Sequence, residues 1–93
     1  IAFSGIGNHK TFISMIKEFG VKVIKDIEFP DHYYYRTEDI NKILEISKKL
    51  NCKIITTEKD YLRLDEKKID EIKFVKSDLR IINENKLIEA ILN

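Results

Sequence analysis

Several residue types that often reveal a function are scarce in this chain of 93 residues, which has one cysteine, one proline and three glycines. A single cysteine cannot build a disulfide framework or a cysteine-based zinc site, so both classes of small domain are excluded. We expect Cys52 to be a small apolar side chain at the start of a strand, and no feature of the sequence favours an oxidising compartment.

Charge of one sign and long apolar runs are also lacking. The 17 basic and 16 acidic residues leave a formal net charge of +1, which disfavours general nucleic-acid binding because such proteins show a basic excess or stripe. We interpret the short pairs Lys48-Lys49 and Lys67-Lys68 as solvated faces. No apolar run approaches the roughly 20 residues that span a bilayer, and we expect a soluble domain without a signal peptide.

The hydrophobic pattern that is present alternates between two periods. Short apolar runs typical of strands occupy residues 1–4, 21–29, 53–57 and 74–82. Each run is followed by apolar residues at helical spacing, which are Phe12, Ile13, Met15, Ile16 and Phe19, then Ile40, Ile43, Leu44, Ile46 and Leu50, then Tyr61, Leu62 and Leu64, and finally Leu87, Ile88, Ile91 and Leu92. This alternation predicts one α/β domain over residues 1–93, with three layers, a four-stranded mostly parallel sheet and helices on both faces.

The predicted strands differ in a way that suggests their order. The runs at 1–4 and 53–57 are short and continuously apolar, as central parallel strands are, whereas those at 21–29 and 74–82 alternate with charged residues. Such alternation suits an edge strand. The order 2-1-3-4, with right-handed crossovers, satisfies both observations.

Three residues are placed to begin or end the predicted helices. Asn8 is a good N-cap for the first helix, and Gly20 suits the C′ position at its end. Thr37 is expected to cap the second helix, with Glu38 and Asp39 in its first turn, where negative charge suits the helix dipole.

Three unusual polar segments each follow a predicted strand. They are Gly5-Ile6-Gly7-Asn8, Pro30-Asp31-His32 and Thr56-Thr57-Glu58-Lys59-Asp60. Because the carboxyl ends of parallel strands lie at one edge of a sheet, we expect these segments to meet near the switch point between the first and third strands.

The first and third segments each have two interpretations. Gly5 and Gly7 either supply only a tight turn before the helix, or leave free backbone amides that hold an anion. The segment from Thr57 to Asp60 is either a helix start with acidic residues in its first turn, or places Lys59 to attract a phosphate or pair with a carboxylate. The Gly-x-x-x-x-Gly-Lys-Ser/Thr phosphate loop is absent, so the chain alone should not bind ATP in that manner.

The second segment is the strongest candidate for chemistry. Pro30 favours an extended Phe29 that ends the strand, and it releases Asp31 and His32 into a loop. His32 can hold, orient or exchange a proton near neutral pH. Asp31 is too close in sequence to be assumed to orient His32, and its side chain can instead cap the turn.

The remaining aromatic and imidazole side chains near these segments have less specific interpretations. Tyr33, Tyr34 and Tyr35 either pack internally or form an amphipathic surface against another domain or a lipid. His9, at the start of the first helix, is expected to be a solvent-exposed turn residue rather than a ligand.

The order and spacing of the three segments, with Phe29 before the second and Tyr35 after it, resemble the C-terminal part of the tetraacyldisaccharide 4'-kinase family, the lipid A 4'-kinases. The resemblance covers nearly the whole chain and weakens after Leu64. His9 stands where the family usually has proline, a change that touches packing more than chemistry. Tyr33 stands where the family often has a second histidine, so only His32 is carried over.

The resemblance implies an ATP-dependent phosphotransferase that moves the γ-phosphate of ATP, with Mg²⁺, to the 4'-hydroxyl of a tetraacyldisaccharide 1-phosphate. The phosphate loop and the metal ligands would belong to an N-terminal kinase domain, over which this C-terminal domain closes. The chain begins at Ile1 rather than at methionine, and the fragment by itself is expected to be inactive. The family acts as a peripheral protein at the cytoplasmic face of the bacterial inner membrane.

The resemblance also implies roles for individual residues. His32 and Asp31 would be catalytic, with His32 assisting a carboxylate of the other domain. Near the substrate or nucleotide it places Gly5, Gly7, Asn8, Thr57, Glu58, Lys59 and Asp60, and it places no metal ligand in this chain. The alternative is a non-catalytic α/β module that binds an anion or a partner. A free-standing hydrolase using Asp31 and His32 is disfavoured, because no nucleophile or metal cluster is evident.

Overall fold

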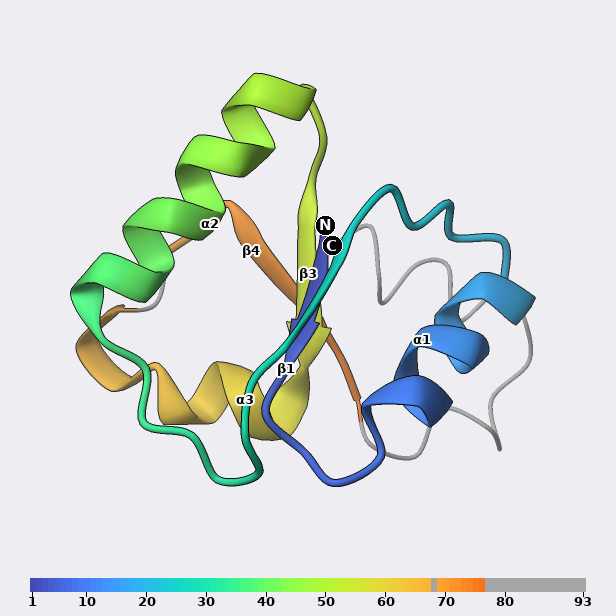
Figure 1. Ribbon diagram of the computed structural model, residues 1–93, viewed down its shortest axis with the longest axis horizontal. Helices are drawn as coiled ribbons and strands as arrows, with labels where there is room; N and C mark the ends of the chain where they lie inside the picture. Colours follow the sequence, from blue (N-terminus) through green and yellow to red (C-terminus); the bar gives the residue numbers. More distant parts are fainter. Residues whose placement is uncertain (68, 77–93) are drawn as a thin grey trace.

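The computed structural model of the chain describes residues 1–67 and 69–76 (Figure 1). Along the chain the elements are β1 (Ala2–Ser4), α1 (His9–Glu18), β2 (Asp26–Glu28), α2 (Thr37–Leu50), β3 (Ile54–Thr57), α3 (Glu58–Arg63), the 3-10 turn η1 (Asp65–Lys67) and β4 (Ile72–Val75). None of the helices within this described part is long and apolar enough to cross a membrane.

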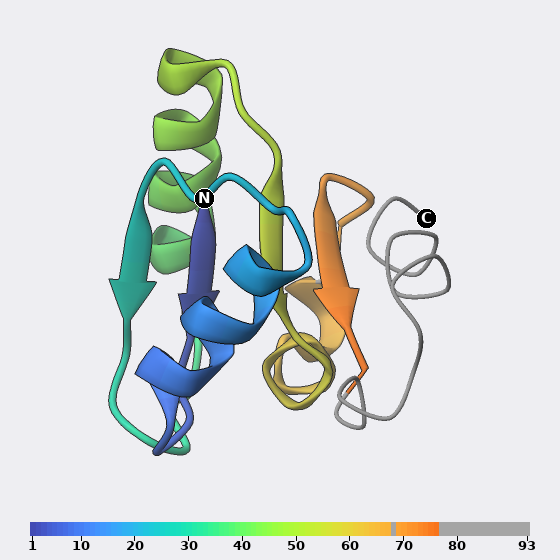
Figure 2. The same ribbon diagram turned by 90° about the vertical axis from the view of Figure 1, so that its right-hand side faces the viewer.

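The four strands form one sheet in the order β2-β1-β3-β4, and all three pairs are parallel (Figure 2). Ala2 lies opposite Asp26 on one side and Ile55 on the other, while Thr56 lies opposite Phe74. The predicted α/β class and strand order are therefore confirmed. Because the strands run in the same direction, their carboxyl ends lie at one edge of the sheet.

Two strand boundaries differ from the sequence prediction. The second strand comprises only Asp26–Glu28 instead of residues 21–29, because the Val21 amide is used to end α1 and the chain pairs with β1 only from the carbonyl of Lys25 onward. The fourth strand begins at Ile72 rather than at residue 74, because Ile72 is buried and lies opposite Ile54 in the register with β3. The rest of the predicted strand to residue 82, and the last predicted helix, lie outside the described residues.

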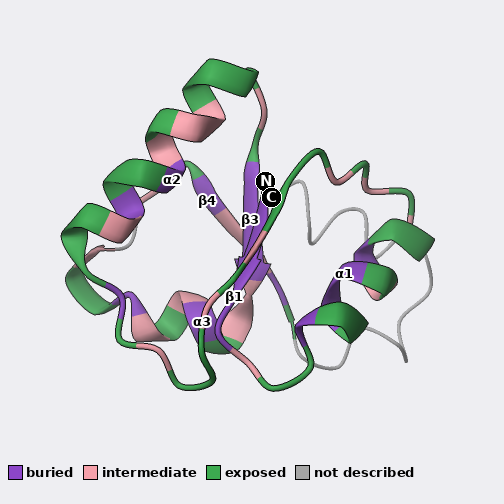
Figure 3. Cartoon of the chain, in the orientation of Figure 1, coloured by how far each residue is buried: buried purple, intermediate pink, exposed green. Residues whose placement is uncertain are grey.

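Two clusters of buried side chains join the three layers. Helix α1 covers one face of the sheet with Phe12, Ile13 and Ile16, which pack with Ala2, Ile55 and Val75. Helices α2 and α3 cover the other face, where the cluster contains Ile1, Phe3, Tyr35, Ile40, Ile43, Ile54, Leu64 and Ile72. Burial is concentrated in the sheet and in the inner faces of these helices (Figure 3). The apolar periodicity thus corresponds to the helix faces that pack on the sheet.

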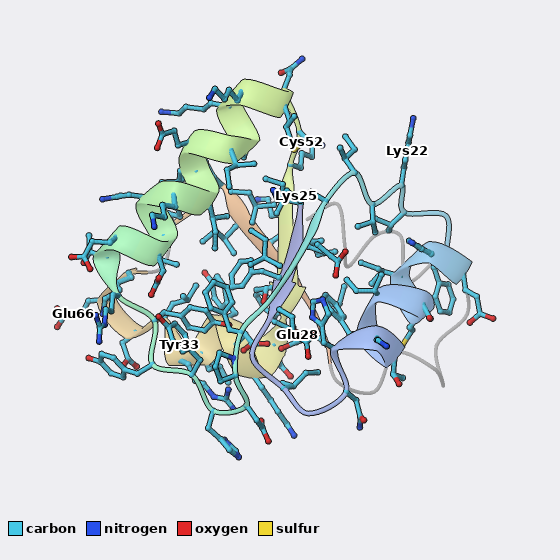
Figure 4. All side chains as sticks on the ribbon, in the orientation of Figure 1. Lys22, Lys25, Glu28, Tyr33, Cys52 and Glu66 are labelled. Atoms are coloured by element: carbon cyan, nitrogen blue, oxygen red, sulfur yellow. The ribbon has the colours of Figure 1, made fainter. Side chains whose placement is uncertain are left out.

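The amino end of β3 agrees with the expectation for the single cysteine. Cys52 is a free, half-buried cysteine that packs against the second cluster just before the strand begins (Figure 4). It serves as a small apolar side chain there.

Helix α1 ends as the sequence predicts. Gly20 has φ +94°, and its N–H donates to the Lys17 carbonyl at 3.0 Å. The Val21 N–H donates to the Ile16 carbonyl, also at 3.0 Å, which completes a Schellman motif. At the other end Asn8 is the N-cap residue, but its side chain makes no capping hydrogen bond.

The start of α2 corrects the predicted cap. Arg36, with extended backbone, is the N-cap residue, and Thr37 is the first helical residue. The reason is Asp39, whose carboxylate accepts the Arg36 backbone N–H at 2.8 Å and so closes the first turn one residue earlier.

Candidate functional site

The three segments that follow β1, β2 and β3 meet at one edge of the sheet, and Gly5 lies at their junction. The Gly5 N–H donates to Asp60 Oδ1 at 2.9 Å, while its carbonyl accepts the His32 N–H at 3.0 Å and Arg63 Nη1 at 2.9 Å. A Cβ at Gly5 would lie 3.0 Å from the Pro30 carbonyl oxygen, so a side chain there would require the loop after β2 to shift. The convergence predicted from the sequence is therefore confirmed.

Asp60 joins the third segment to the other two. Its side chain is wholly buried and accepts the Gly5 N–H, the Tyr35 hydroxyl at 2.9 Å and the Thr57 hydroxyl at 2.5 Å. Thr57 Oγ1 in turn accepts the Asp60 N–H at 3.1 Å, so Thr57 is the N-cap of α3. The interpretation of this segment as a helix start is confirmed, and Asp60 holds loops together beneath the surface.

The tyrosine run divides into packed and exposed side chains. Tyr35 is wholly buried, with ring centroids 5.5 Å from Phe3 and 5.1 Å from Phe29, and Tyr33 stacks on Phe29 at 4.8 Å. Both tyrosines lie on the α2–α3 side of the sheet, where Figure 4 labels Tyr33. Tyr34 is 70% exposed, with Lys67 Nζ 5.2 Å above its ring. Internal packing therefore explains two of the three tyrosines.

The phenols of the two packed tyrosines both have carboxylate acceptors. Burial, together with the nearby Asp60 carboxylate, raises the pKa of Tyr35 well above its usual range. The hydrogen bond to Asp39, 2.9 Å long, is the main cause that raises the pKa of Tyr33. Both hydroxyls thus act as donors that fix the loop.

His32 differs from every packed residue of the edge because its side chain is 80% exposed. Its backbone has φ +60°, in the left-handed region that residues other than glycine adopt uncommonly, with asparagine, aspartate and histidine the most frequent among them. The Tyr33 N–H bond to the Pro30 carbonyl, 3.1 Å, and the His32 N–H bond to Gly5 hold this conformation. The proline turn therefore fixes the backbone from which the imidazole projects.

Asp31 lies beside His32 without a hydrogen bond to it. Asp31 Oδ2 is 3.7 Å from His32 Nε2, beyond hydrogen-bond length, and the Asp31 side chain is 54% exposed. The sequence argument against assuming that Asp31 orients His32 agrees with this distance.

Arg63 is the residue of the edge that sequence reasoning missed. It contacts Gly5 through Nη1, and its Nη2 lies 3.1 Å from His32 Nδ1. Its Nη1 is also 3.6 Å from the buried carboxylate of Asp60, three residues earlier on the same helix face. A search of the α3 face beyond the recognised segment, at the i+3 position from Asp60, would have found it.

A cleft of about 490 Å³ opens beside these loops. Of the predicted site residues it is lined by Gly7, Asn8, Asp31, His32, Thr57, Glu58 and Lys59. Ile6, Phe12, Met15 and Val75 form its apolar wall, and Thr11, Arg63 and Lys76 complete the lining. Gly5 and Asp60 are absent from the lining and support it from the adjacent buried layer. The structure thus separates residues that face the cleft from residues that position them.

The donor set of the cleft suits an anion more than a metal ion. Lys59, Arg63 and Lys76 are cationic, and they are accompanied by the carboxylates of Asp31 and Glu58. Within residues 1–67 and 69–76, no three His, Cys, Asp or Glu side chains are grouped as metal ligands would be. The cationic side chains that line the cleft therefore favour an anionic ligand there.

His9 corrects an expectation, because it is buried and not a solvent-exposed turn residue. Its side chain is 3% exposed, with Nδ1 2.5 Å from Ser4 Oγ and Nε2 2.7 Å from Asp26 Oδ2. It thereby joins the start of α1 to the end of β1 and the start of β2. The residue types are those of a hydrolase triad, but Ser4 is wholly buried, so a substrate cannot reach its hydroxyl.

The fold and the edge together define a class of protein. It is a parallel α/β domain whose strand-end loops hold an exposed, strained histidine beside a cleft rich in cationic side chains, at the position where such domains handle ligands. A domain of this kind suits the recognition of a phosphorylated or otherwise anionic group.

Comparison with known proteins identifies the family. The family model described as tetraacyldisaccharide-1-P 4'-kinase matches residues 1–93. A tetraacyldisaccharide 4'-kinase of Pelagibacter ubique (strain HTCC1062) is 49% identical over 92 residues, which are 99% of this chain and 29% of that protein. The enzyme of the same name from Rickettsia bellii (strain OSU 85-389) is 39% identical over 90 residues, 97% of this chain and 28% of that protein. The chain belongs to the tetraacyldisaccharide 4'-kinase family.

The chain spans less than a third of the length of these curated relatives. No solved structure matches the chain significantly.

Proposed function

We propose that residues 1–93 form the C-terminal domain of an ATP-dependent lipid kinase that phosphorylates the 4'-hydroxyl of a tetraacyldisaccharide 1-phosphate. Two findings support this proposal, namely membership of the kinase family and the small share of each relative that the chain covers. An N-terminal domain with the phosphate loop would hold ATP and Mg²⁺. This domain would close over it, and the chain alone would be inactive.

The observation that most strongly supports a catalytic edge is the conformation of His32. Left-handed backbone at a residue other than glycine costs about 1–3 kcal/mol and persists where the surrounding structure enforces it, often at functional sites. Here that conformation presents an exposed imidazole beside the cleft instead of packing it. Exposure of the ring gains little for folding, and we take this combination of left-handed backbone and exposed imidazole as support for a functional role.

The geometry supports a mechanism based on positioning. Phosphoryl transfer is catalysed mainly by orienting the reactants and stabilising charge, and closure of a second domain excludes water. His32 would assist a carboxylate of the N-terminal domain that activates the 4'-hydroxyl. Lys59 and the backbone of Gly7 and Asn8, which line the cleft, would lie near phosphate groups, and Asp31 would contribute a carboxylate beside His32.

The substrate suggests where the whole enzyme works. A disaccharide with four acyl chains stays in the bilayer, so we place the enzyme as a peripheral protein at the cytoplasmic face of the bacterial inner membrane. On the family resemblance, we place this reaction in lipid A biosynthesis.

Substitution of His32 tests the proposal. In the intact enzyme His32→Ala should lower kcat about 100-fold or more, because a positioned acid or base contributes on the order of 10²–10⁴-fold. His32→Asn is the matched variant, since asparagine tolerates φ > 0 and removes only the imidazole. Both variants should bind ATP and melt like the wild-type enzyme, as shown by nucleotide titration and thermal unfolding.

Wild-type turnover by both variants would contradict a catalytic role for His32. If turnover persists and the 93-residue chain alone binds ATP or a phosphorylated disaccharide tightly around Gly5–Asn8, the alternative of a non-catalytic anion-binding module is favoured. Amide chemical shifts of the isolated chain during these titrations would show that outcome.

A further inference from the structure

Arg63 contacts several parts of the strand-end edge at once. Its Nη1 donates to the Gly5 carbonyl at 2.9 Å and lies 3.6 Å from Asp60 Oδ1, while its Nη2 lies 3.1 Å from His32 Nδ1. The Arg63 side chain is 25% exposed, whereas that of His32 is 80% exposed. A largely fixed guanidinium thus holds an imidazole that otherwise projects into solvent.

The contact between Arg63 and His32 determines where the imidazole proton resides. A guanidinium has only donors and does not lose its proton in proteins. The ring nitrogen that it meets, His32 Nδ1, must therefore accept, and the neutral ring carries its proton on Nε2. The other ring edge faces Asp31, whose Oδ2 lies 3.7 Å from Nε2, so this side of the ring accommodates a carboxylate.

We propose that Arg63 is a positioning residue that fixes the tautomer and orientation of His32, so that Nε2–H is presented as a hydrogen-bond donor to a carboxylate. This inference rests on the proposed function, in which that carboxylate belongs to the nucleotide-binding domain. The fork of the guanidinium is essential, because its two nitrogens bridge the Gly5 carbonyl and the imidazole together. A lysine has one nitrogen and cannot make this bridge.

A spectroscopic test examines the tautomer without relying on activity. In intact enzyme labelled with ¹⁵N-histidine, with the His32 signals assigned by comparison with His32→Asn, Nδ1 should resonate as an unprotonated nitrogen and Nε2 as a protonated one. In Arg63→Met the two shifts should move toward each other, as they do when an imidazole exchanges between tautomers. A protonated Nδ1 in the wild-type enzyme, or unchanged shifts in Arg63→Met, would overturn the proposal.

Steady-state kinetics test whether Arg63 affects turnover, as a positioning residue should. Arg63→Met should lower kcat about 10- to 100-fold with little change in KM, by analogy with the partners that orient histidines in metal sites. The kcat of Arg63→Lys should lie nearer to that of Arg63→Met than to that of the wild type. The control is Arg36→Met, which alters an exposed arginine outside the cleft lining and should keep wild-type kcat. Wild-type kcat in Arg63→Met, or a raised KM with unchanged kcat, would contradict a positioning role.

A combined variant separates this inference from the proposed function. If Arg63 acts through His32, Arg63→Met added to His32→Ala should cost no more turnover than His32→Ala alone. Independent, multiplied losses would overturn the inference while leaving a catalytic role for His32. Unchanged turnover in His32→Ala would instead remove the proposed catalytic role of His32, and the ¹⁵N shifts would still decide whether Arg63 fixes the ring.

Discussion

A single buried imidazole ties three elements of this domain together. His9 is the first residue of α1, and its ring nitrogens contact Ser4 at the end of β1 and Asp26 at the start of β2. Asp26 is half exposed and can be solvated by water, but Ser4 is wholly buried and depends on His9 for its side-chain partner. Loss of the His9 contact should therefore destabilise the domain mainly through the unpaired Ser4 hydroxyl.

Substitution of His9 should destabilise the domain in a way that a second substitution repairs. His9→Leu leaves the Ser4 hydroxyl buried without its partner, which should cost about 1–3 kcal/mol of unfolding free energy. Ser4→Ala added to His9→Leu should recover part of that loss, because the orphaned hydroxyl is gone. Urea denaturation of the chain measures both effects.

Lys10, the exposed residue next to His9, supplies the control for the variants at His9 and Ser4. Lys10→Leu, on the same helix, should change stability by no more than about 0.5 kcal/mol. If the double variant is less stable than His9→Leu, the hydroxyl is not the source of the cost.

Residue-level prediction from sequence succeeded where a backbone constraint was visible. The proline and the strand before it were enough to place His32 in a loop at the sheet edge. His9 was assigned wrongly because Asp26, its partner 17 residues away, reaches it only through the pairing of β1 with β2. Arg63 was missed for the same reason, since its partners lie on two other loops.

At the level of elements, the loop after β1 contains two glycines with different reasons for being glycine. An added Cβ at Gly5 would lie 3.0 Å from a backbone oxygen of Pro30 and 3.2 Å from the Tyr35 hydroxyl. At Gly7 the nearest atom would be Asp31 Oδ2 at 3.7 Å, an ordinary contact. Packing of the loops therefore requires the first glycine, and folding places no such demand on the second.

Alanine substitutions at the two glycines form a matched pair. Gly5→Ala should lower the unfolding free energy by about 1–3 kcal/mol, because the loop after β2 must move to admit the methyl group. Gly7→Ala should leave stability within about 0.5 kcal/mol of the wild type. Equilibrium urea unfolding distinguishes them, and equal stability of the two variants would contradict the packing argument.

The boundaries of elements were less predictable than their existence. Strand periodicity extended the second strand back to residue 21, but the Schellman ending of α1 uses the Val21 amide and delays the strand to Asp26. The cap of α2 moved from Thr37 to Arg36 because Asp39 reaches back to the Arg36 backbone. Both differences arise from hydrogen bonds that hydrophobic patterns do not contain.

For the whole molecule, the class and strand order followed from which strands are continuously apolar. β1 and β3 are buried on both faces and central, whereas β2 is mostly exposed and β4 is partly exposed, and these two flank the described sheet. That order brings all three polar segments to one edge, and it could be predicted. The buried hydrogen bonds that bind the edge together could not, because they depend on side-chain directions across three loops.

Tyr35 joins these loops to the core, and its ionisation should lower the stability of the whole domain at alkaline pH. Its hydroxyl donates to buried Asp60, and burial is the largest cause that raises the pKa of Tyr35 above the ordinary value of 10.0. In the unfolded chain the phenol loses its proton at lower pH than in the folded domain. Its contribution is therefore fully present below pH 10 and is lost as the pH rises further.

The prediction is a steeper loss of stability for the wild-type chain than for Tyr35→Phe above pH 10. The slope of the unfolding free energy against pH should differ between the two proteins by up to about 1.4 kcal/mol per pH unit, the value for one proton. At pH 7 Tyr35→Phe should already be about 1–3 kcal/mol less stable, since Asp60 loses a donor, so the two curves should converge with rising pH. Urea unfolding from pH 7 to 11 measures this, with Tyr34→Phe, whose ring is 70% exposed, as a control that should follow the wild type. Parallel curves for wild type and Tyr35→Phe would show that the buried phenol does not link the folding of the domain to pH.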